Sequence, residues 1–579
     1  MYGPVSDLVP SSPVFEMYPI GFTTIAEYLE RNGFRVRIVN LAVRMLEDPQ
    51  FDVPRFLGKI DAEAFGIDLH WLPHAHGSLE IARIIKQKHP ETSIIMGGLS
   101  ATYYCREILK NHHDIDYIVR GDSTEESCLE LMNAITSRGR RRSGGKNTIV
   151  STIRSCEHLE AIPNLAWRDE NGLVRETPIK NIPDTLDHLM TDYSIVVKSV
   201  LRHGDFASVK PVKDWFRYPI TGLCHMRGCT QNCVTCGGSA YAYRRFYCRE
   251  KTAFSSPRKV VDDITAIGSF TKGPIYVIGD LRARGIKGAY SILKELRKEK
   301  IQNRIVFELF EPADKAYIEA ISRSAENFAV TISPDSHDEK IRFRQGRRYS
   351  TNALEDTVAH ALQYGAEKFD MYFMIGLPGQ DYNSAVGDVE YAARLIRKFG
   401  SRQGAKEKLH AFTSPLAPFV DPGSIAFEEP EKLGYRLFCR NFTGHRERLT
   451  EPSWKYILNY ETSWMSRDEI VAATYESALH LNRMREEFGI TTCAEYREIE
   501  RRIRMAVRIM KAVDRVVSAK QMKNSPEDLK DELMVRDEID SLNTEILCPK
   551  RELEWKSGGV RLNVKKYAKL LIESLTGKN

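Results

Sequence analysis

The sequence lacks the features of a membrane or secreted protein. No window of its 579 residues approaches 18 uninterrupted apolar residues, and residues 1–13, MYGPVSDLVPSSP, lack the cationic start and apolar run of a secretory signal. It also lacks a strong charge excess, since 84 Lys and Arg against 78 Asp and Glu leave a net charge of +6. Such a mild surplus does not by itself indicate nucleic acid or an anionic membrane. We therefore expect a cytoplasmic chain with no membrane partner and no nucleic acid partner.

The cysteine count does not suit a disulfide framework. Eleven cysteines are an odd number, and in a reducing compartment they are better explained as thiols or metal ligands. With 42% apolar and 28% charged residues the chain should be an ordinary folded protein, neither collagen-like nor largely disordered. Because a single core stops growing near about 250–300 residues, we expect three or four domains.

The first part of the chain alternates between strand-like and helix-like segments. Short apolar strands separated by amphipathic helices predict a parallel sheet with helices on both faces, which is a doubly wound α/β domain. Strands are expected at 34–42, 62–70, 92–98 and 116–122, and helices at 18–33, 77–90, 103–111 and 123–135.

A basic, glycine-rich segment follows this alternation. Residues 137–146, SRGRRRSGGK, are poorly suited to a core, so we expect an exposed linker there. A nucleic-acid-binding arm is the less favoured interpretation, because no aromatic residues interleave the charges. The mixed region beyond it carries a turn signal, RDENGLV, at 168–174.

A second alternation begins near Trp215 and has six βα units in series. Such a series predicts a complete or partial TIM-like barrel, with an active site where the carboxyl ends of the strands meet the loops. Beyond about Gly434 the chain becomes helical and charged, and its apolar residues recur at helical spacing, which predicts half-buried helices. The barrel strands are expected at 216–224, 274–280, 304–310, 328–334, 369–376 and 409–416.

Three cysteines cluster directly after the first expected barrel strand. Cys229, Cys233 and Cys236 form a C-x3-C-x2-C pattern, with Cys224 and Cys248 on either side. Three thiolates on one short loop can hold three irons of a 4Fe-4S cube and leave the fourth iron open to a ligand. An open coordination position is what distinguishes a catalytic metal from a structural one.

Two other interpretations of this loop are a structural zinc site, which stays open, and a ferredoxin-like electron carrier. A structural zinc ion would need a fourth ligand from Cys224, Cys248 or His225, and it would suit a zinc-stapled RNA-binding protein. The spacing matches neither of the two ferredoxin patterns, which disfavours a simple electron carrier.

Polar residues and glycines gather at the carboxyl ends of the other barrel strands. Because these ends share one rim of a barrel, their joint placement is more informative than any one of them. They are Gly279-Asp280, Glu308 and Glu311, Ser333 to Ser336, Gly376-Leu377-Pro378-Gly379, and Ser414-Pro415.

The cysteine motif at the start of a βα barrel resembles the signature of the radical S-adenosylmethionine (SAM) superfamily. The resemblance implies a 4Fe-4S cluster on Cys229, Cys233 and Cys236, and a SAM molecule on the open iron that is cleaved to a 5'-deoxyadenosyl radical. The residue before the last cysteine is usually aromatic in that family and is Thr235 here. By the same resemblance SAM would be bound by Gly279, Asp280, Glu308 and Ser333 and by Gly376, Leu377, Pro378 and Gly379. Arg344 is a candidate partner of the SAM carboxylate, although a surface arginine is the simpler interpretation.

Residues 18–33, 94–102 and 116–127 resemble the cobalamin-binding domain that precedes the barrel in a large radical SAM subfamily. Gly97 and Gly98, which follow a strand, would let cobalamin lie against backbone at the sheet edge. The histidine of the D-x-H-x-x-G cobalt-binding motif has no counterpart here, since His70 lies on another strand without the glycine. The usual first strand of such a domain is not evident, so we expect a later start than usual or a lost edge strand.

The resemblance implies four regions and one leading activity. They are a cobalamin-binding-like domain at 1–145, a connecting region at 146–210, a radical SAM barrel at 211–430 and a helical C-terminal domain at 431–579. The leading hypothesis is a cobalamin-dependent radical SAM enzyme that transfers a methyl group to an unactivated carbon, with a reductant such as ferredoxin or flavodoxin. A rearrangement or ring-forming enzyme that does not use methylcobalamin is the alternative. The substrate is not named by the sequence.

Overall fold

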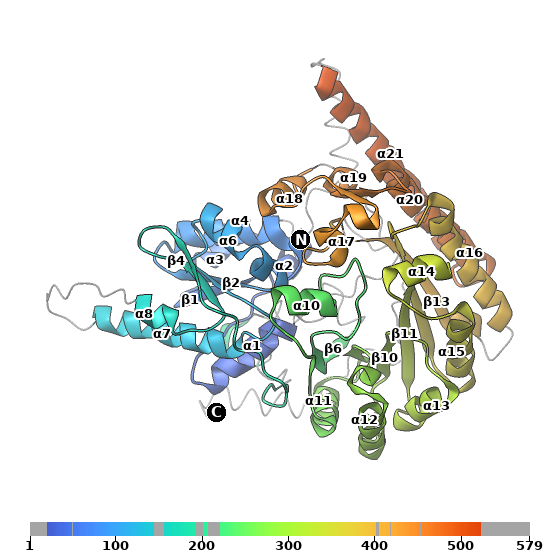
Figure 1. The fold of residues 1–579 in the computed structure, drawn as a ribbon, viewed down its shortest axis with the longest axis horizontal. Coiled ribbons are helices and arrows are strands. Elements are labelled where there is room, and N and C mark those ends of the chain that lie inside the picture. The colour runs from blue at the N-terminus through green and yellow to red at the C-terminus, as the bar shows by residue number, and fades with distance from the viewer. Residues whose placement is uncertain are drawn as a thin grey trace.

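The computed structural model describes residues 20–48, 50–143, 156–190, 198, 201–205, 220–400, 405–416, 418–451 and 453–522. Two sheets organise these residues (Figure 1). The N-terminal sheet has five strands and the second sheet has six, and the C-terminal helices lie against both units. The expected first strand before residue 18 falls outside the described residues.

The N-terminal sheet follows the sequence order β1-β2-β3-β4-β5. Strands β1 (Ala64–Asp68), β2 (Ser93–Gly97) and β3 (Tyr117–Val119) are parallel and lie where the apolar runs predict them. Strands β4 (Leu165–Arg168) and β5 (Val174–Glu176) add an antiparallel hairpin. The turn of this hairpin is the predicted RDENGLV turn, in which Gly172 has a φ of +76°.

Helices cover both faces of this sheet, which confirms the doubly wound expectation. Because successive strand residues face opposite sides, Ile94 and Met96 of β2 pack with α4 (Ala75–Lys88) and α6 (Cys105–Asn111). Ile95 lies on the other face, in the cluster formed with α1 (Ile20–Arg31) and α7 (Glu125–Ser143). The remaining short helices of this unit are α2 (Leu41–Glu47), α3 (Val53–Leu57), α5 (Leu99–Tyr103) and α8 (Cys156–Glu160).

Two local expectations about this unit are wrong. Of the strand expected at 34–42, residues 34–40 form no strand within the described part of the chain, and residues 41 and 42 begin α2. The Asn40 side chain caps this helix by accepting from the Val43 N–H. Residues 137–143 are helical, because α7 continues to Ser143. A basic composition is compatible with the end of a helix as well as with a linker.

The second sheet is the expected partial barrel of six parallel strands, in the order β13-β12-β11-β10-β9-β6. Each consecutive pair is parallel, as serial βα units require. The strands are β6 (Thr221–Cys224), β9 (Ile275–Ile278), β10 (Ile305–Leu309), β11 (Phe328–Asp335), β12 (Lys368–Ile375) and β13 (Leu409–Pro415). The helices between them are α11 (Pro257–Phe270), α12 (Ile286–Glu299), α13 (Lys315–Ser324), α14 (Glu339–Gln345), α15 (Thr351–Gln363) and α16 (Tyr382–Phe399).

The C-terminal region is helical, as expected, with one added hairpin. In Figure 1, α18 (Phe442–Arg448) lies beside α4 of the N-terminal unit, and α20 (Arg467–Glu487) lies beside α16 of the barrel. The hairpin consists of β14 (Tyr435–Leu437) and β15 (Tyr460–Thr462). The other helices are α17 (Ile425–Glu428), α19 (Trp454–Ile457) and α21 (Cys493–Met522).

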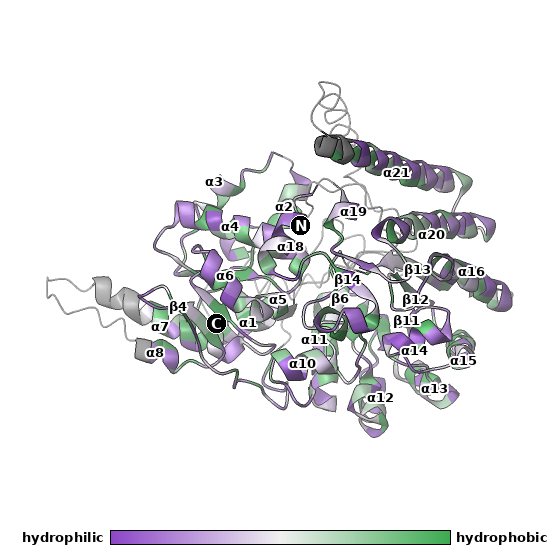
Figure 2. Ribbon diagram, turned by 45° about the horizontal axis from the view of Figure 1, so that its top comes forward, coloured by the Kyte–Doolittle hydropathy of each residue, from purple (hydrophilic) through white to green (hydrophobic). Residues whose placement is uncertain are grey.

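The last described helix, α21, is half buried, as its periodicity predicts. Ile503 and Ile509 are buried, while Arg501 and Arg504 form ion pairs with glutamates on the exposed side. Figure 2 shows this as alternating hydrophilic and hydrophobic segments along the helix. None of the helices described in the structure is both long and apolar enough to cross a bilayer.

Candidate active site

The three clustered cysteines lie on a loop at the carboxyl end of β6. A short strand, β7 (Met226–Arg227), enters the loop, and α10 (Ala240–Phe246) and β8 (Ala253–Phe254) follow it. Cys233 is buried, and Cys229 and Cys236 are half buried, and all three are free thiols. The loop therefore presents three sulfur donors within one short turn of chain.

Backbone N–H groups of the loop point at two of these sulfurs. The Gln231 N–H donates to Cys229 Sγ at 3.3 Å, and the Gly238 N–H donates to Cys236 Sγ at 3.3 Å. Hydrogen bonds to sulfur stabilise negative charge on a thiolate and tune the potential of an iron-sulfur cluster. Burial raises the pKa of the Cys229 and Cys236 thiols, and these N–H groups act against that rise.

Distant parts of the chain hold the loop in place. The Val234 N–H donates to Gln345 O at 3.0 Å, and the Gly237 N–H donates to Asp421 Oδ2 at 3.1 Å. Thr235 accepts a hydrogen bond from Gln345 Nε2 at 2.7 Å. Where the resembling family usually has an aromatic residue, this chain therefore has a buried hydroxyl that fixes the loop to the end of α14.

One arginine lies near two of the sulfurs, those of Cys229 and Cys233, and sequence reasoning missed it. Arg347 is mostly buried and pairs with Asp335, with 3.2 Å between Nε and Oδ2. Burial raises the pKa of Cys233 to about 11, and the positive charge of Arg347 acts against this. The available signal was Gly346: it has a φ of +100°, and a Cβ there would lie 2.7 Å from Asn232 O. That glycine turn lets Arg347 follow close to the cysteine loop.

A single zinc ion and an iron-sulfur cluster need different arrangements of the same thiolates. Among the residues that the structure describes, no three His, Cys, Asp or Glu side chains converge where one metal ion would fit. A zinc ion needs all its sulfur ligands about 2.3 Å from one point. An iron-sulfur cube binds each thiolate on a different iron, so its ligands need not converge.

Gly279 and Glu308 meet at the neighbouring strand ends. The Gly279 N–H donates to Glu308 Oε2 at 2.6 Å, which joins the ends of β9 and β10. Gly279 has a φ of +91°, and a Cβ there would lie 2.6 Å from Met226 Sδ, so a larger residue would collide with the approach to the cysteine loop. Burial raises the pKa of Glu308, while the Gly279 N–H and Arg347 lower it.

Asp280 is engaged within the protein. Its carboxylate accepts from Arg282 Nη2 at 2.6 Å and from the Phe310 N–H at 2.9 Å, and it caps the short helix Leu281–Arg284. The Asp280 carboxylate is therefore held in place by contacts within the barrel.

Ser333 lies where β11 becomes irregular. The register between β11 and β12 shifts between Ile332 and Asp335, and Asp335 has a φ of +67°, which is uncommon for a residue with a side chain. Ser333 is half buried beside this irregularity. Bulges of this kind often re-aim a side chain next to an active site.

The Gly376-Leu377-Pro378-Gly379 turn is clamped from several sides. Gln380 Oε1 accepts from the N–H groups of Gly376, at 2.8 Å, and Leu377, at 3.2 Å. Tyr435 Oη donates to Gly376 O at 2.7 Å, and Leu377 and Pro378 are both buried. These hydrogen bonds from Gln380 and Tyr435 fix the backbone conformation of the turn.

The last glycine of this turn lies against Arg344. Gly379 has a φ of +84°, and a Cβ there would fall on the Arg344 guanidinium. Arg344 is exposed, and its guanidinium carbon lies 5.9 Å from the centre of the Trp464 ring. Of the two arginines, Arg347 is the one beside the cysteines, and Arg344 covers the outside of the turn.

Gly97 and Gly98 end β2 in the other sheet. Gly98 has a φ of +116°, and a Cβ there would lie 2.5 Å from His70 N, so its turn packs tightly on the end of β1. Ser100 Oγ then donates to His70 O at 2.9 Å. Gly97 has room for a Cβ, with Val119 O at 3.7 Å. His70 itself lies at this strand end and is exposed.

The end of β2 faces the helix that follows the cysteines. Tyr103 of α5 stacks near Phe246 of α10, with ring centres 5.0 Å apart. Tyr247 Oη lies 3.5 Å from Leu99 O, the residue after Gly98. The carboxyl edge of the N-terminal sheet and the cysteine rim of the barrel are therefore adjacent.

Two family models match the chain, in the order of the two sheets. A B12 binding domain matches residues 8–128, and the Radical SAM superfamily matches residues 223–392. The curated hopanoid C-3 methylase of Methylococcus capsulatus is 22% identical over 387 residues, which are 61% of this chain and 63% of that protein. The chain thus covers slightly less than two thirds of that relative.

Solved structures share the fold at low sequence identity. TsrM, a radical S-adenosylmethionine methyltransferase from Kitasatospora setae with tryptophan substrate and a SAM analogue bound, gives a TM-score of 0.55 at 14% identity, over 81% of this chain and 88% of that one. OxsB, a cobalamin-dependent SAM radical enzyme with aqua-cobalamin and SAM bound, gives 0.52 at 12% identity, over 97% and 78%.

Proposed function

We propose that this chain, which carries a B12-binding domain followed by a radical SAM domain, is a cobalamin-dependent radical SAM methyltransferase. One observation carries the proposal: the carboxyl edge of the N-terminal sheet meets the helix that follows the cysteine loop, through the Tyr103–Phe246 and Leu99–Tyr247 contacts. Two cofactors bound at these edges would share one substrate.

Each cofactor has residues that fit it. Cys229, Cys233 and Cys236 would hold the 4Fe-4S cluster, because they lie together on the loop after β6 and two of their sulfurs already accept backbone N–H hydrogen bonds. When bound, these groups supply a 5'-deoxyadenosyl radical and a transferable methyl group. We assign SAM to Gly279, Asp280, Glu308, Ser333, Gly376, Leu377, Pro378 and Gly379, and cobalamin to the turn at Gly97 and Gly98.

The protein's own contribution is positioning and exclusion of water. Glu308 is fixed by the Gly279 N–H, so its carboxylate has one defined direction at the rim. The Gly376 turn is buried and clamped, which lets backbone rather than mobile side chains line the nucleoside. A cofactor enzyme works in this way, since the cofactors carry the hard chemistry and the protein orients them.

The reaction needs a substrate and a source of electrons. We propose methyl transfer, because it is what the names of hopanoid C-3 methylase and TsrM have in common. We propose an unactivated carbon as the acceptor, because an adenosyl radical supplies the hard chemistry that such a carbon needs. A small reductant such as ferredoxin or flavodoxin would supply the electron in a reducing, cytoplasmic setting. Nine cysteines of the described part of the chain are free thiols, which is consistent with such a setting.

Anaerobic reconstitution tests the proposal. The wild-type chain should bind about four irons, since three thiolates hold one cube, and should release 5'-deoxyadenosine from SAM after reduction. Replacing Cys229, Cys233 and Cys236 together by alanine should abolish both properties. Cys493→Ala is the matched control, because this exposed cysteine lies far along the chain in α21.

The corrinoid requirement separates methyl transfer from other radical chemistry. Purified protein incubated with hydroxocobalamin should retain about one corrinoid per chain, as expected for one binding domain. Colourless protein carrying one zinc would refute the enzyme, and SAM cleavage without any retained corrinoid would refute methyl transfer.

A further inference from the structure

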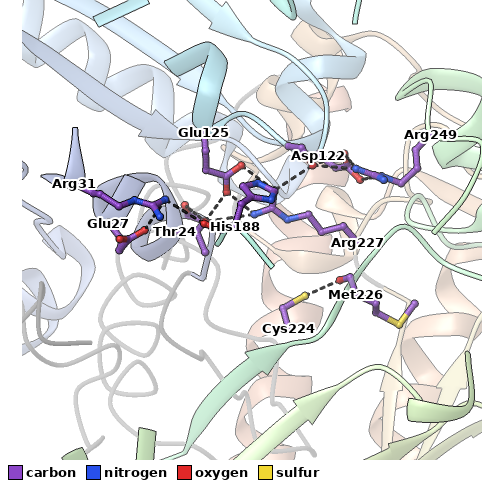
Figure 3. Close-up of polar contacts among 12 residues, drawn as sticks. Thr24, Glu27, Arg31, Asp122, Glu125, His188, Cys224, Met226, Arg227 and Arg249 are labelled. Atoms are coloured by element: carbon purple, nitrogen blue, oxygen red, sulfur yellow. Dashed lines mark hydrogen bonds and ion pairs between the residues drawn. The ribbon is translucent and has the colours of Figure 1, made fainter. Parts of the chain in front are cut away.

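Two buried arginines flank the cysteine loop. Arg227 is the last residue of β7, two residues before Cys229, and its side chain is 14% exposed. Arg249 follows α10 and is 1% exposed. Both side chains reach out of the barrel and into the N-terminal domain, as Figure 3 shows. Neither arginine contributes to the sulfur or SAM sites assigned above.

Arg227 is paired with a carboxylate at the start of α7. Its Nη1 donates to Glu125 Oε2 at 2.9 Å, and its Nη2 donates to Oε1 of the same carboxylate. Thr24 Oγ1 donates to Glu125 Oε1 at 2.8 Å, so the carboxylate also ties in α1. Burial raises the pKa of Glu125, but Arg227 outweighs it and lowers that pKa to about 2.

Arg249 makes the corresponding contacts at the other end of the loop. Its Nη2 donates to Asp122 Oδ1 at 3.0 Å and to Ser123 Oγ at 3.0 Å, and its Nε donates to the same Asp122 carboxylate. The side chain also passes over Gly228: a Cβ there would lie 2.8 Å from Arg249 Cδ. The cysteine loop comprises residues 228–248. Arg249 directly follows its last residue and lies over its first residue, Gly228, so Arg249 links the two ends of the loop.

The four charges come from two domains and balance each other. Asp122 and Glu125 belong to one turn of the N-terminal unit, and Arg227 and Arg249 bracket the cysteines. A buried bidentate pair is strongly directional, and removal of one partner leaves the other charge buried and unpaired. Such pairs fix the register of an interface better than they add stability.

We propose that the Asp122–Glu125 turn is a positioning element through which the N-terminal domain orders both ends of the cysteine loop. This inference rests on the proposed function, since the loop is taken to carry the cluster. It implies that the cluster and the corrinoid domain are coupled. A ligand that stabilises docking of the N-terminal domain would also slow loss of the cluster, because coupling between two sites is reciprocal.

Conservative variants test this in the full-length protein. Glu125→Gln and Asp122→Asn keep the shape of each side chain and remove its charge. Hydrogen exchange in peptides covering 228–248 should be faster by about tenfold or more, because local opening rates report local stability. Release of iron from reconstituted protein to a chelator should accelerate in parallel.

The control is a charge pair of similar burial inside one domain. Glu176 accepts from Arg120 Nη1 at 2.7 Å, with side chains 17% and 11% exposed, and it also pairs with the exposed Arg106. All three residues belong to the N-terminal unit. Glu176→Gln should leave exchange of the cysteine loop and iron release unchanged. The reversed pair, Glu125→Arg with Arg227→Glu, should restore slow exchange at least in part if pairing across the interface is what matters.

The outcomes separate the two proposals. Wild-type exchange and iron release in both Glu125→Gln and Asp122→Asn would overturn the positioning role. If either variant fails to fold, Ser123→Ala removes no charge but takes away a hydroxyl that accepts from Arg249 Nη2 and from Arg227 Nη1, and it should still speed exchange in the loop. A wild-type chain that never binds iron would refute the proposed function, whereas exchange in the iron-free protein would still decide the positioning role.

Discussion

At the scale of single residues, the site depends on close approaches that only glycine permits. Gly376 is the clearest case: its φ is +99°, and a Cβ there would lie 2.8 Å from Tyr460 Oη. Tyr460 is fully buried and belongs to LNYETSW, a segment of the C-terminal region. The segment therefore has a structural role, because its Tyr460 side chain packs against the backbone of the Gly376 turn.

Gly376→Ala should destabilise the fold by about 1–3 kcal/mol through backbone strain, with a further loss from the collision with Tyr460. SAM affinity should fall as well, because the turn must shift. Gly365→Ala is the matched control, since Gly365 has a φ of +88° but no atom within 4 Å of its virtual Cβ. Urea unfolding and equilibrium SAM binding measure both effects. Equal losses in the two variants would show that the Tyr460 contact is irrelevant.

At the scale of elements, the turn after β2 fixes how the N-terminal sheet edge is built. The Leu69 N–H donates to Gly97 O at 2.7 Å, and the Ala101 N–H donates to Leu69 O at 3.1 Å. The chain that follows β1 is therefore hydrogen-bonded to the β2–α5 turn on both sides of Leu69. These hydrogen bonds bring the Gly98 backbone into contact with the His70 backbone. Gly98 therefore has no room for a Cβ, whereas Gly97 has, and alanine substitutions at the two positions should have different effects on stability.

Gly98→Ala should cost at least about 3 kcal/mol, because its new Cβ would meet backbone atoms that cannot move aside and its φ is in the left-handed region. Gly97→Ala should cost less than about 1 kcal/mol, since Gly97 is in ordinary contact distance of Val119 O. Thermal unfolding compares the two. Corrinoid binding should be lost with Gly98→Ala, and a tolerated Gly98→Ala variant would contradict this account of the turn.

At the scale of the whole molecule, one hydrophobic core joins the N-terminal sheet to the C-terminal region. It contains Ile108 and Leu109 of α6 together with Phe442 and Trp454. His445 lies within it at 0% exposure: Nδ1–H donates to Asn441 O at 2.6 Å, and Nε2 accepts from Asn459 Nδ2–H at 2.8 Å. This tautomer follows from the two partners.

Burial lowers the pKa of His445 to about 4, from a usual value of 6.5. Between pH 6.5 and pH 4 the His445 side chain binds a proton in the unfolded chain but not in the folded chain. Protonation therefore favours the unfolded chain, and the stability that the protein has above pH 6.5 is progressively lost as the pH falls toward 4. The free energy of unfolding should drop by up to about 3 kcal/mol over this window.

His445→Gln should flatten this dependence, measured by urea unfolding at several pH values. Some slope should remain, because burial also lowers the pKa of His225 to about 4. His113→Gln is the control, since that histidine is exposed. A slope unchanged by His445→Gln would show that this histidine does not titrate on unfolding.

Much of the fold was predictable from the sequence because its signals are local. The parallel strands of both sheets lie where apolar runs of a few residues occur, and the helices between them have the expected period. The hairpin strands β4 and β5 were not predicted, although the turn between them was. Residues 34–40 misled the prediction, because their alternating apolar residues form no strand and lead to a helix cap at Asn40. Residues 137–143 misled it because basic composition is shared by linkers and helix ends.

The sequence by itself determined the order of the two domains and the three clustered cysteines, since strand and helix periods and the cysteine spacing are written within a few consecutive residues. Only the tertiary structure decided that Arg347 rather than Arg344 lies beside the cysteines, that Asp280 is engaged internally, and that Glu125 pairs with Arg227 across 102 residues of chain. Such contacts depend on how whole elements pack, and no local pattern of residues specifies which distant side chain will fill a given position.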